Sequence, residues 1–303
     1  IVGGLYAIGY TPAQLDSLLR TQDWLSLLSD QIGRKNQYYS ERQHTDRYIA
    51  RYSLSQESRV LPAGILPGES VMNMLNELTI GYHEMESFDD LPIPFACVSY
   101  DIVTGEEYVS RSGSLPMAIR ASMSIPAAFL PVRTDSMILV DGGVYNNFPV
   151  DVVRQMGAEI VIGVDLYDGP YTIDEMGNVA EIFNQLTNFL GEEKYNANKD
   201  DVDLILRPNL EGFSAASFTK AAIDTILMRG EEVARENWEE ILALRTKIGI
   251  GDDYIASRPA KHLIDNDMLM IGEIKFEGID ERESRRMMRF LELEEYSVIS
   301  LGE

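Results

Sequence analysis

The apolar positions at the start of the chain predict two helices. Residues 1–9 are apolar and rich in small side chains, as expected of a buried helix packed closely on a neighbour. Thr11 and Pro12 follow, and these residues are preferred at an N-cap and at the first helical position. A polar, Tyr- and Arg-rich stretch over 33–60 predicts a surface excursion. Helical spacing then returns over roughly 68–82.

From residue 93 onward the pattern changes to strands that alternate with helices. Residues 93–103 are apolar and predict a strand, which ends at a turn at Thr104-Gly105. Met137 to Val140 predicts a second, shorter strand. These segments indicate a mixed α/β protein.

A strand–helix–strand unit is predicted immediately after this short strand. Asn147 is expected to cap a helix that has Pro149 near its start. Residues 158–166 form a continuous apolar, β-branched run, as expected of a strand buried on both faces. This order predicts a βαβ unit, and therefore a sheet that is parallel in part.

The rest of the pattern divides the chain into a large and a small part. Helices are predicted over 179–191 and 215–247, and the composition changes around Arg258-Pro259. A half-exposed strand, a short amphipathic helix and the start of another element follow, over 271–278, 281–291 and 296–301. We therefore expect one domain over 1–260 and the start of a second over 268–303.

Composition and charge narrow the class of protein. The chain has 303 residues, 45% hydrophobic and 25% charged, which is typical of a globular protein. Its 26 Lys and Arg against 49 Asp and Glu give a net charge of −23. This argues against nucleic acid, which requires a basic face. It also argues against electrostatic capture by anionic lipid, but leaves apolar insertion into a membrane open.

The single cysteine, Cys97, excludes an internal disulfide and a cysteine-based zinc site. Because it lies inside an apolar strand, we expect it to be a small buried core residue.

Asp141 is the strongest candidate for chemistry. It directly follows the predicted strand Met137–Val140, at the edge where open α/β sheets form their ligand crevice. Gly142 and Gly143 come next, and glycines permit positive φ and let another backbone or a substrate approach closely. The same three residues also make an ordinary turn. On these residues alone, both interpretations stay open.

Three longer stretches resemble the patatin-like phospholipases. VDGGVYNNFPVDVV (140–153) resembles the second catalytic motif of this family, and SRSGSLPMAIRASMSIPAAFLPV (110–132) resembles the segment ahead of the catalytic aspartate. FDDLPIPFACVSYDIVTGE (88–106) resembles its central strand and turn. The resemblance covers about residues 1–260. It implies a three-layer α/β sandwich with a mainly parallel central sheet, in which Asp141 is paired with a nucleophilic serine.

The nucleophile itself is not found in the sequence. The family places it in Gly-x-Ser-x-Gly, a tight strand-to-helix elbow, and this pattern occurs nowhere in the 303 residues. Residues 1–19 resemble the helix that immediately follows the elbow. We therefore expect the first strands, the serine and the glycine-rich oxyanion loop to precede Ile1. Ser122 and Ser124 lack the flanking glycines, and Ser124 is expected to position the loop near the site.

The candidate site favours a Ser–Asp dyad over a triad, because no histidine lies near Asp141 in the sequence. In a dyad the carboxylate accepts the serine proton and returns it to the leaving group. His44 and His83 are expected to be surface or packing residues. Asn146 and Asn147 are expected to hold the Asp141 loop and to cap the next helix.

No metal and no cofactor are predicted. The acidic clusters at 192–203 and 231–240 are interpreted as solvated helix faces rather than cation sites.

The small C-terminal part resembles a different family. IGEIKFEGIDERESRRMMRFLEL (271–293) is similar to the first strand and helix of a POTRA domain. Such domains are periplasmic and precede outer-membrane β-barrels. This resemblance implies a patatin domain fused to a POTRA domain and a barrel. It also implies a location at the outer membrane, at the cell surface or outside the cell, in preference to the cytoplasm.

Together these observations predict a serine-type lipid acyl hydrolase, a phospholipase A or esterase. Asp141 is its base, Gly142 and Gly143 support that base, and the serine lies upstream of Ile1. The expected partners are a phospholipid or other acyl ester, a membrane lipid surface and a second copy in a homodimer. The alternative is a non-catalytic patatin-like module for lipid binding or outer-membrane assembly. The residues immediately before Ile1 discriminate between the two.

Overall fold

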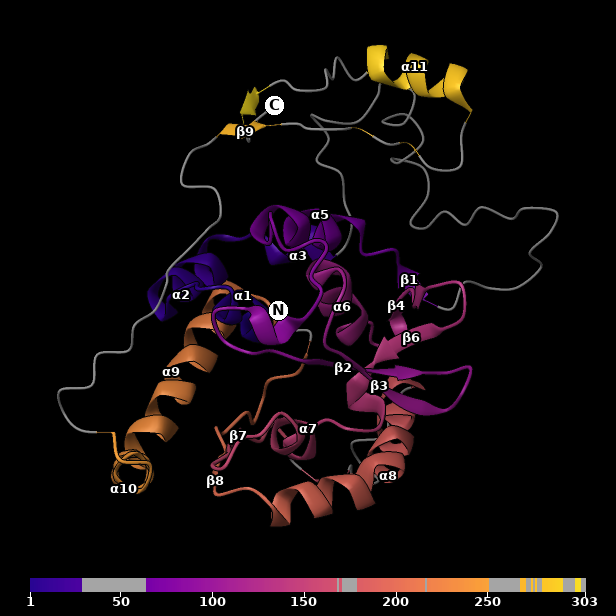
Figure 1. The fold of residues 1–303 in the computed structure, drawn as a ribbon. Coiled ribbons are helices and arrows are strands. Elements are labelled where there is room, and N and C mark those ends of the chain that lie inside the picture. Colours follow the sequence, from indigo (N-terminus) through magenta and orange to yellow (C-terminus); the bar gives the residue numbers. More distant parts are fainter. Residues whose placement is uncertain are drawn as a thin grey trace. The chain divides into compact units, whose positions relative to one another are not determined.

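The computed structural model is drawn in Figure 1. It describes residues 1–28, 64–167, 169–170, 179–215, 217–250, 268–270, 274, 276, 280–290 and 298–300. Contacts divide the chain into two compact units, Ile1–Pro259 and Ala260–Glu303. The predicted excursion over 33–60 and the composition change at Arg258-Pro259 lie outside the described residues, so the domain limits at 260 and 268 stay predictions.

The predicted helices of the first unit are present, and the one expected over 179–191 extends to Asp200. In chain order the helices are α1 (Val2–Ala7), α2 (Pro12–Thr21), α3 (Trp24–Leu28), α5 (Glu69–Leu78), α6 (Leu115–Ser122), α7 (Val150–Gln155), α8 (Val179–Asp200), α9 (Lys220–Glu236) and α10 (Trp238–Lys247). Of these, α3 and α6 were not predicted. The single helix expected over 215–247 is divided at Asn237 into α9 and α10. Two single 3-10 turns, η1 (Phe88–Asp90) and η2 (Gly142–Val144), complete the helical elements described in this unit.

The largest sheet is antiparallel. Its four strands have the order β3-β2-β6-β5 and consist of β2 (Cys97–Asp101), β3 (Glu106–Ser110), β5 (Val132–Arg133) and β6 (Ile138–Asp141). Within the described ranges of this unit, parallel pairing occurs in two separate pairs, β1 (Gly64–Leu66) with β4 (Ala127–Phe129) and β7 (Ile162–Val164) with β8 (Leu204–Leu206). A mixed α/β fold is therefore present, but the mainly parallel central sheet is not confirmed.

The βαβ prediction around α7 is wrong within the described part of the chain. β6 and β7 flank α7 in sequence, but they belong to different sheets. The run over 158–166 is not a strand buried on both faces, because Ile162 and Val164 are 45% and 58% exposed. The opposite face of β7 is the covered one, and there Gly163 lies against the ring of Phe148. A run of β-branched residues therefore did not indicate two-sided burial here.

Asp101 joins the β2–β3 hairpin to the start of β6. Its Oδ1 accepts hydrogen bonds from the backbone N–H groups of Val103 (3.1 Å) and Ile138 (3.0 Å). Its Oδ2 accepts one from the Thr104 hydroxyl at 2.9 Å. Gly105 completes the predicted turn with φ of +75°. This carboxylate fixes the register that places the end of β6 beside the middle of β2.

The N-terminal helices form as predicted. Thr11 caps α2 in a reciprocal arrangement, in which the Gln14 N–H donates to its hydroxyl and the Thr11 N–H donates to Gln14 Oε1. In α1, Gly4 is buried so tightly that an added Cβ would lie 2.5 Å from Ile119 Cδ1 of α6. The close packing expected of residues 1–9 is therefore confirmed.

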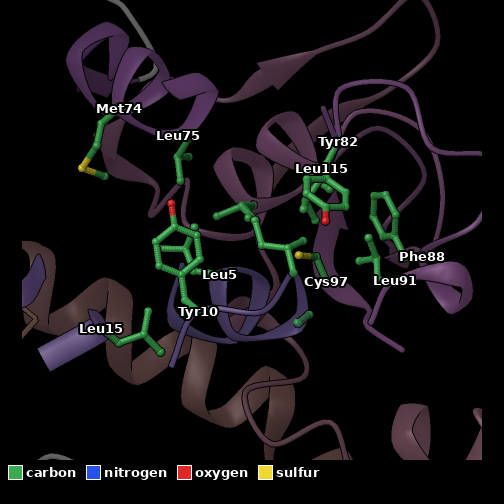
Figure 2. Packing of buried hydrophobic residues seen from close by; sticks show 14 of the residues in the cluster. Leu5, Tyr10, Leu15, Met74, Leu75, Tyr82, Phe88, Leu91, Cys97 and Leu115 are labelled. Atoms are coloured by element: carbon green, nitrogen blue, oxygen red, sulfur yellow. The ribbon is translucent and has the colours of Figure 1, made fainter. Parts of the chain in front are cut away.

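The main hydrophobic core lies between α1, α5, α6 and the buried face of β2. Figure 2 shows Leu5, Leu75, Leu115 and Cys97 within this cluster. Cys97 is buried as predicted, and burial raises the pKa of its thiol to about 12. The thiol is therefore a packing group and not a nucleophile.

The second unit contains β9 (Met268–Met270), α11 (Glu281–Phe290) and β10 (Val298–Ser300), with β9 and β10 antiparallel. The helix expected over 281–291 and the element expected over 296–301 are present. Ile274 and Phe276 are half-buried but lie outside any strand, and the rest of the strand predicted over 271–278 is outside the described residues.

Candidate active site

Asp141 is the last residue of β6, and its side chain is fixed by the turn that follows. Its Oδ1 accepts a hydrogen bond from the Gly143 N–H at 2.7 Å. Burial raises the pKa of the Asp141 carboxyl group, and the bond from Gly143 offsets part of this increase. The site therefore holds a half-buried carboxylate with more affinity for a proton than an exposed aspartate has, as a general base requires.

The two glycines after Asp141 are required for close packing rather than for an unusual backbone conformation. The sequence suggests positive φ as one reason for these glycines, but neither Gly142 nor Gly143 has positive φ. A Cβ on Gly142 would lie 2.4 Å from the Val98 carbonyl oxygen of β2. A Cβ on Gly143 would lie 2.8 Å from Asn147 Oδ1. The turn therefore lies directly on the neighbouring strand.

The beginning of α1 lies near the same carboxylate. The amino group of Ile1 interacts electrostatically with Cys97 on β2 and with Asp141 on β6. The amino end of α1 therefore lies close to the end of β6.

Ser124 is not exposed and its hydroxyl is engaged. It donates to the Arg120 carbonyl oxygen (2.8 Å) and accepts from Arg120 Nη1 (2.6 Å). Its own carbonyl oxygen accepts the Asp141 N–H at 3.0 Å. Ser122 is the last residue of α6 and is half-buried. Ser124 therefore positions the Asp141 strand, as expected, and is poorly suited to act as a nucleophile.

Asn146 holds the loop after Asp141 through a buried network of side chains. Its Nδ2 donates to Glu107 Oε1 (2.6 Å) and to Asp151 Oδ1 (3.1 Å). Its Oδ1 accepts from Asn198 Nδ2 at 3.0 Å, which ties the loop to α8. Lys194 of α8 forms ion pairs with the same two carboxylates, at 3.2 Å and 2.6 Å. The predicted role of Asn146 is confirmed.

The predicted role of Asn147 as a helix cap is wrong. The N-cap of α7 is Pro149, and no side chain caps this helix. Proline at this position fixes φ close to a helical value. Asn147 is exposed and contacts Gly143 instead.

A pocket lies next to the Asp141 loop, lined by residues that include Gly143, Tyr145, Asp165, Tyr167 and Tyr195. Asp165 is buried and accepts hydrogen bonds from the Tyr195 hydroxyl (2.7 Å), the Tyr167 N–H (3.0 Å) and Arg207. Burial raises its pKa, but these donors outweigh burial and leave the pKa below its usual value. Asp165 was not predicted as a site residue, although an aspartate near the end of an apolar run is a detectable signal.

The remaining candidates do not come together at this site. His83 is exposed, and its Nε2 lies 3.2 Å from the Asn76 carbonyl oxygen. His44 lies outside the described residues. In the part of the chain that the structure covers, no group of three or more His, Cys, Asp or Glu side chains could hold a metal ion. No helix in that same part is both long and apolar enough to cross a membrane.

Comparison with known proteins identifies the class. The sequence profile of the patatin-like phospholipases matches residues 1–154, and the chain belongs to this family. This match contains β2, α6, β6 and the Asp141 loop. The family is one of lipid acyl hydrolases.

Individual relatives agree over short stretches. An uncharacterised NTE family protein of Mycobacterium tuberculosis is 39% identical over 92 residues, which is 30% of this chain and 16% of that protein. A patatin-like phospholipase domain-containing protein of Caenorhabditis elegans is 45% identical over 86 residues, 27% of this chain and 6% of that protein. Patatin-like phospholipase domain-containing protein 7 of Mus musculus is 40% identical over 80 residues, 26% and 6% respectively. The matched stretches thus span a small part of each relative.

Proposed function

We propose that the protein is a serine-type lipid acyl hydrolase, a phospholipase A or esterase, that uses a Ser–Asp dyad. Asp141 is the base, and the nucleophilic serine precedes Ile1. The observation that carries this proposal is the position of Asp141 at the end of β6. There its Oδ1 accepts a hydrogen bond from Gly143, and its carboxylate lies near the amino end of α1. A Gly-x-Ser-x-Gly elbow joined to Ile1 would present its serine oxygen to this carboxylate.

The proposed reaction has two half-reactions. Asp141 accepts the proton of the serine hydroxyl while the serine oxygen attacks the acyl carbon, and the carboxyl group then protonates the leaving alcohol. In the second half-reaction, water attacks the acyl-enzyme. Asp141 accepts the proton of this water and then returns a proton to the serine oxygen as the acid leaves. The raised pKa of Asp141 suits this exchange, because the carboxyl group must both take up and return a proton.

The test is Asp141→Asn in the protein extended upstream of Ile1. The asparagine keeps an oxygen that accepts from Gly143 and loses the proton acceptor. We expect hydrolysis of a phospholipid and of a p-nitrophenyl ester to fall by at least ~10²–10⁴-fold. Exposed Asp135→Asn is the matched control and should be fully active. Near-complete activity in a folded Asp141→Asn protein would refute the assignment.

A second test uses a polypeptide limited to Ile1–Glu303. Loss of an activated serine from a comparable hydrolase costs on the order of 10⁶-fold. This polypeptide should therefore neither hydrolyse p-nitrophenyl esters nor react with a fluorophosphonate. Stoichiometric labelling would place the nucleophile within the 303 residues.

The non-catalytic alternative is a lipid-binding or assembly module with the same fold. It predicts a segment before Ile1 without Gly-x-Ser-x-Gly. Determining those residues is the most direct way to discriminate between the two functions.

We also propose that a membrane lipid surface is approached through apolar insertion. α8 exposes four large apolar side chains, namely Ile182, Leu186, Phe189 and Leu190. The net charge of −23 favours zwitterionic over anionic lipid. Leu186→Asp should weaken flotation with phosphatidylcholine vesicles, whereas Leu242→Asp on α10 should not.

The C-terminal proposals rest on the POTRA resemblance of 271–293. They are the start of a POTRA domain followed by a barrel, and a location at the outer membrane or cell surface. Barrel strands encoded after Glu303 and fractionation with outer membranes are the results expected. The proposed homodimer is tested by sedimentation of the complete protein.

A further inference from the structure

Ser99 is a buried residue with an unsatisfied hydroxyl group. It lies in the middle of β2 and is fully buried. Among the buried side chains that the structure describes, its Oγ is the one oxygen or nitrogen atom without a hydrogen-bond partner. A buried polar group without a partner costs about 1–3 kcal/mol. Such a group at a site of chemistry therefore calls for an explanation.

The strand register places Ser99 directly opposite Asp141. β2 and β6 are antiparallel, and Ser99 pairs with Asp141. Residues opposite each other in an antiparallel pair project from the same face, with Cβ atoms about 4.5–5.5 Å apart. The serine oxygen is one bond from its Cβ and the carboxylate oxygens are two bonds from theirs. Rotation about the side-chain bonds can therefore bring Ser99 Oγ within hydrogen-bond distance of Asp141 Oδ2.

The Asp141 carboxylate has room for this donor. Oδ1 accepts from Gly143, and nothing in the described ranges donates to Oδ2. The other side chains on this face of β2 do not compete for it. Cys97 is a neutral packing group, and the oxygens of Asp101 accept from Val103, Thr104 and Ile138.

We propose that Ser99 is a positioning residue for the base of the proposed dyad, and that its hydroxyl donates a hydrogen bond to Asp141 Oδ2 in the assembled active site. This inference rests on the proposed function of Asp141. Gly143 and Ser99 together hold the two carboxylate oxygens from opposite sides, which orients the lone pair that takes the serine proton. A hydroxyl that donates to a carboxylate oxygen stabilises the ionised form of the carboxyl group. The hydrogen bond from Ser99 therefore keeps Asp141 deprotonated, and able to accept a proton, at neutral pH.

The groups around the carboxylate define what else can move its titration. The Ile1 amino group at α1 is the charged group that lowers the pKa of Asp141. The ionisable neighbours by strand register are Cys97 and Asp101 on β2 and Tyr108 on β3, which pairs with Ser99 from the other side. A peptide bond replaces that amino group in a chain extended upstream. Ser99→Ala changes none of these groups, so a change in the titration of Asp141 reports the loss of the hydroxyl.

The experiment compares Ser99→Ala with Ser110→Ala in the protein extended upstream of Ile1. Ser110 is a buried serine on β3 that pairs with Cys97 on the same face. Ser110→Ala therefore removes a buried hydroxyl that does not lie opposite Asp141. In Ser99→Ala we expect kcat to fall about tenfold at pH 7 and the acid limb of the pH–rate profile to move up by about one pH unit. Ser99→Cys, which keeps a weak donor of similar size, should lie between Ser99→Ala and the unchanged protein. Ser110→Ala should leave the profile unchanged.

The outcomes separate this inference from the proposed function. Full activity of Asp141→Asn overturns the proposed function. Loss of activity in Asp141→Asn, with the same pH profile in Ser99→Ala and the unchanged protein, overturns only the role of Ser99. Lower activity of Ser99→Ala without a shift of the acid limb indicates a structural role and also overturns it. Titration of the Asp141 carboxyl carbon by ¹³C NMR gives the same comparison without turnover, and an equal midpoint in both proteins refutes the hydrogen bond.

Discussion

The backbone N–H of Asp141 donates a hydrogen bond to the carbonyl oxygen of Ser124, at 3.0 Å. This bond joins the segment after α6 to the end of β6, and so connects two of the stretches that resemble the patatin-like phospholipases. Arg120 holds the Ser124 hydroxyl from the other side, because its carbonyl oxygen accepts from this hydroxyl and its guanidinium group donates to it. The position of the candidate base thus depends on a serine whose hydroxyl is held by Arg120.

Ser124→Ala is expected to weaken the fold but to spare catalysis. The substitution leaves Arg120 Nη1 without its bond to the serine hydroxyl inside a buried site, which costs about 1–3 kcal/mol. The Ser124 carbonyl oxygen is unaffected and still accepts from Asp141. Urea unfolding should show the loss of stability, while the rate of ester hydrolysis stays close to that of the unchanged protein. Abolished hydrolysis in a folded variant would mean that Ser124 takes part in the reaction.

Gly142→Ala should disrupt the site because of its contact with β2. The new methyl group would lie 2.4 Å from the Val98 carbonyl oxygen, a backbone atom that has no side-chain freedom. Overpacking of this kind costs about 1–3 kcal/mol and moves the Asp141 turn. Thermal unfolding and hydrolysis should both decline.

Gly230→Ala is the matched control for this substitution. Gly230 lies inside α9, and an added Cβ meets nothing within 4 Å. Alanine there should stabilise the protein by about 0.5–1 kcal/mol. Equal stability of the two variants would show that the contact between Gly142 and Val98 is unimportant.

Ala127→Gly should stabilise the protein. Ala127 has φ of +67°, and among the described residues it is the one non-glycine residue with positive φ. The left-handed conformation costs an L-residue roughly 1–2 kcal/mol, which glycine avoids at the expense of a more flexible unfolded chain. The melting temperature should therefore rise. An Ala128→Gly control, at a residue with negative φ, should lower it.

Local features could be predicted from the sequence, whereas pairing between distant segments could not. Thr11 and Gln14 form their cap within one turn of chain, so the start of α2 was found correctly. β6 and Asp141 were also located, because a short apolar strand before Asp-Gly-Gly is a local signal. One antiparallel partner of β6 is β2, about forty residues earlier, and nothing in either strand encodes that pairing. The cross-strand position of Ser99 was invisible for the same reason.

Asp165→Asn should destabilise the protein in a pH-dependent way. Hydrogen bonds from Tyr195 and Arg207 hold the pKa of Asp165 below its unfolded value of about 3.9. The stabilisation is therefore fully present above that pH and is lost as the pH falls through the folded pKa. The variant should be about 1–3 kcal/mol less stable at pH 7, and the difference should shrink below about pH 4. Glu231→Gln, in an exposed pair with Arg235, should change stability by less than about 1 kcal/mol.

Asp141→Asn should stabilise the fold that it inactivates. Burial raises the pKa of Asp141, so the ionised carboxylate is less favourable in the folded protein than in the unfolded chain. A raised carboxyl pKa makes stability decline as the pH rises from the unfolded value of about 3.9 through the folded value. The neutral asparagine avoids this cost and still accepts from Gly143. Its melting temperature should exceed that of the unchanged protein at pH 8, and the two should converge as the pH falls below about 4.

Exposed Asp135→Asn removes the same charge without relieving burial, and it serves as the reference for this comparison. It corrects for the weaker repulsion that any lost negative charge brings to a chain with a net charge of −23. The stabilisation specific to Asp141 is the excess over Asp135→Asn, measured by differential scanning calorimetry across this pH range. An Asp141→Asn protein that is less stable than Asp135→Asn at pH 8 would show that the carboxylate is a structural anchor. Any loss of stability that the protein accepts for its catalytic site would then have to arise from residues other than Asp141.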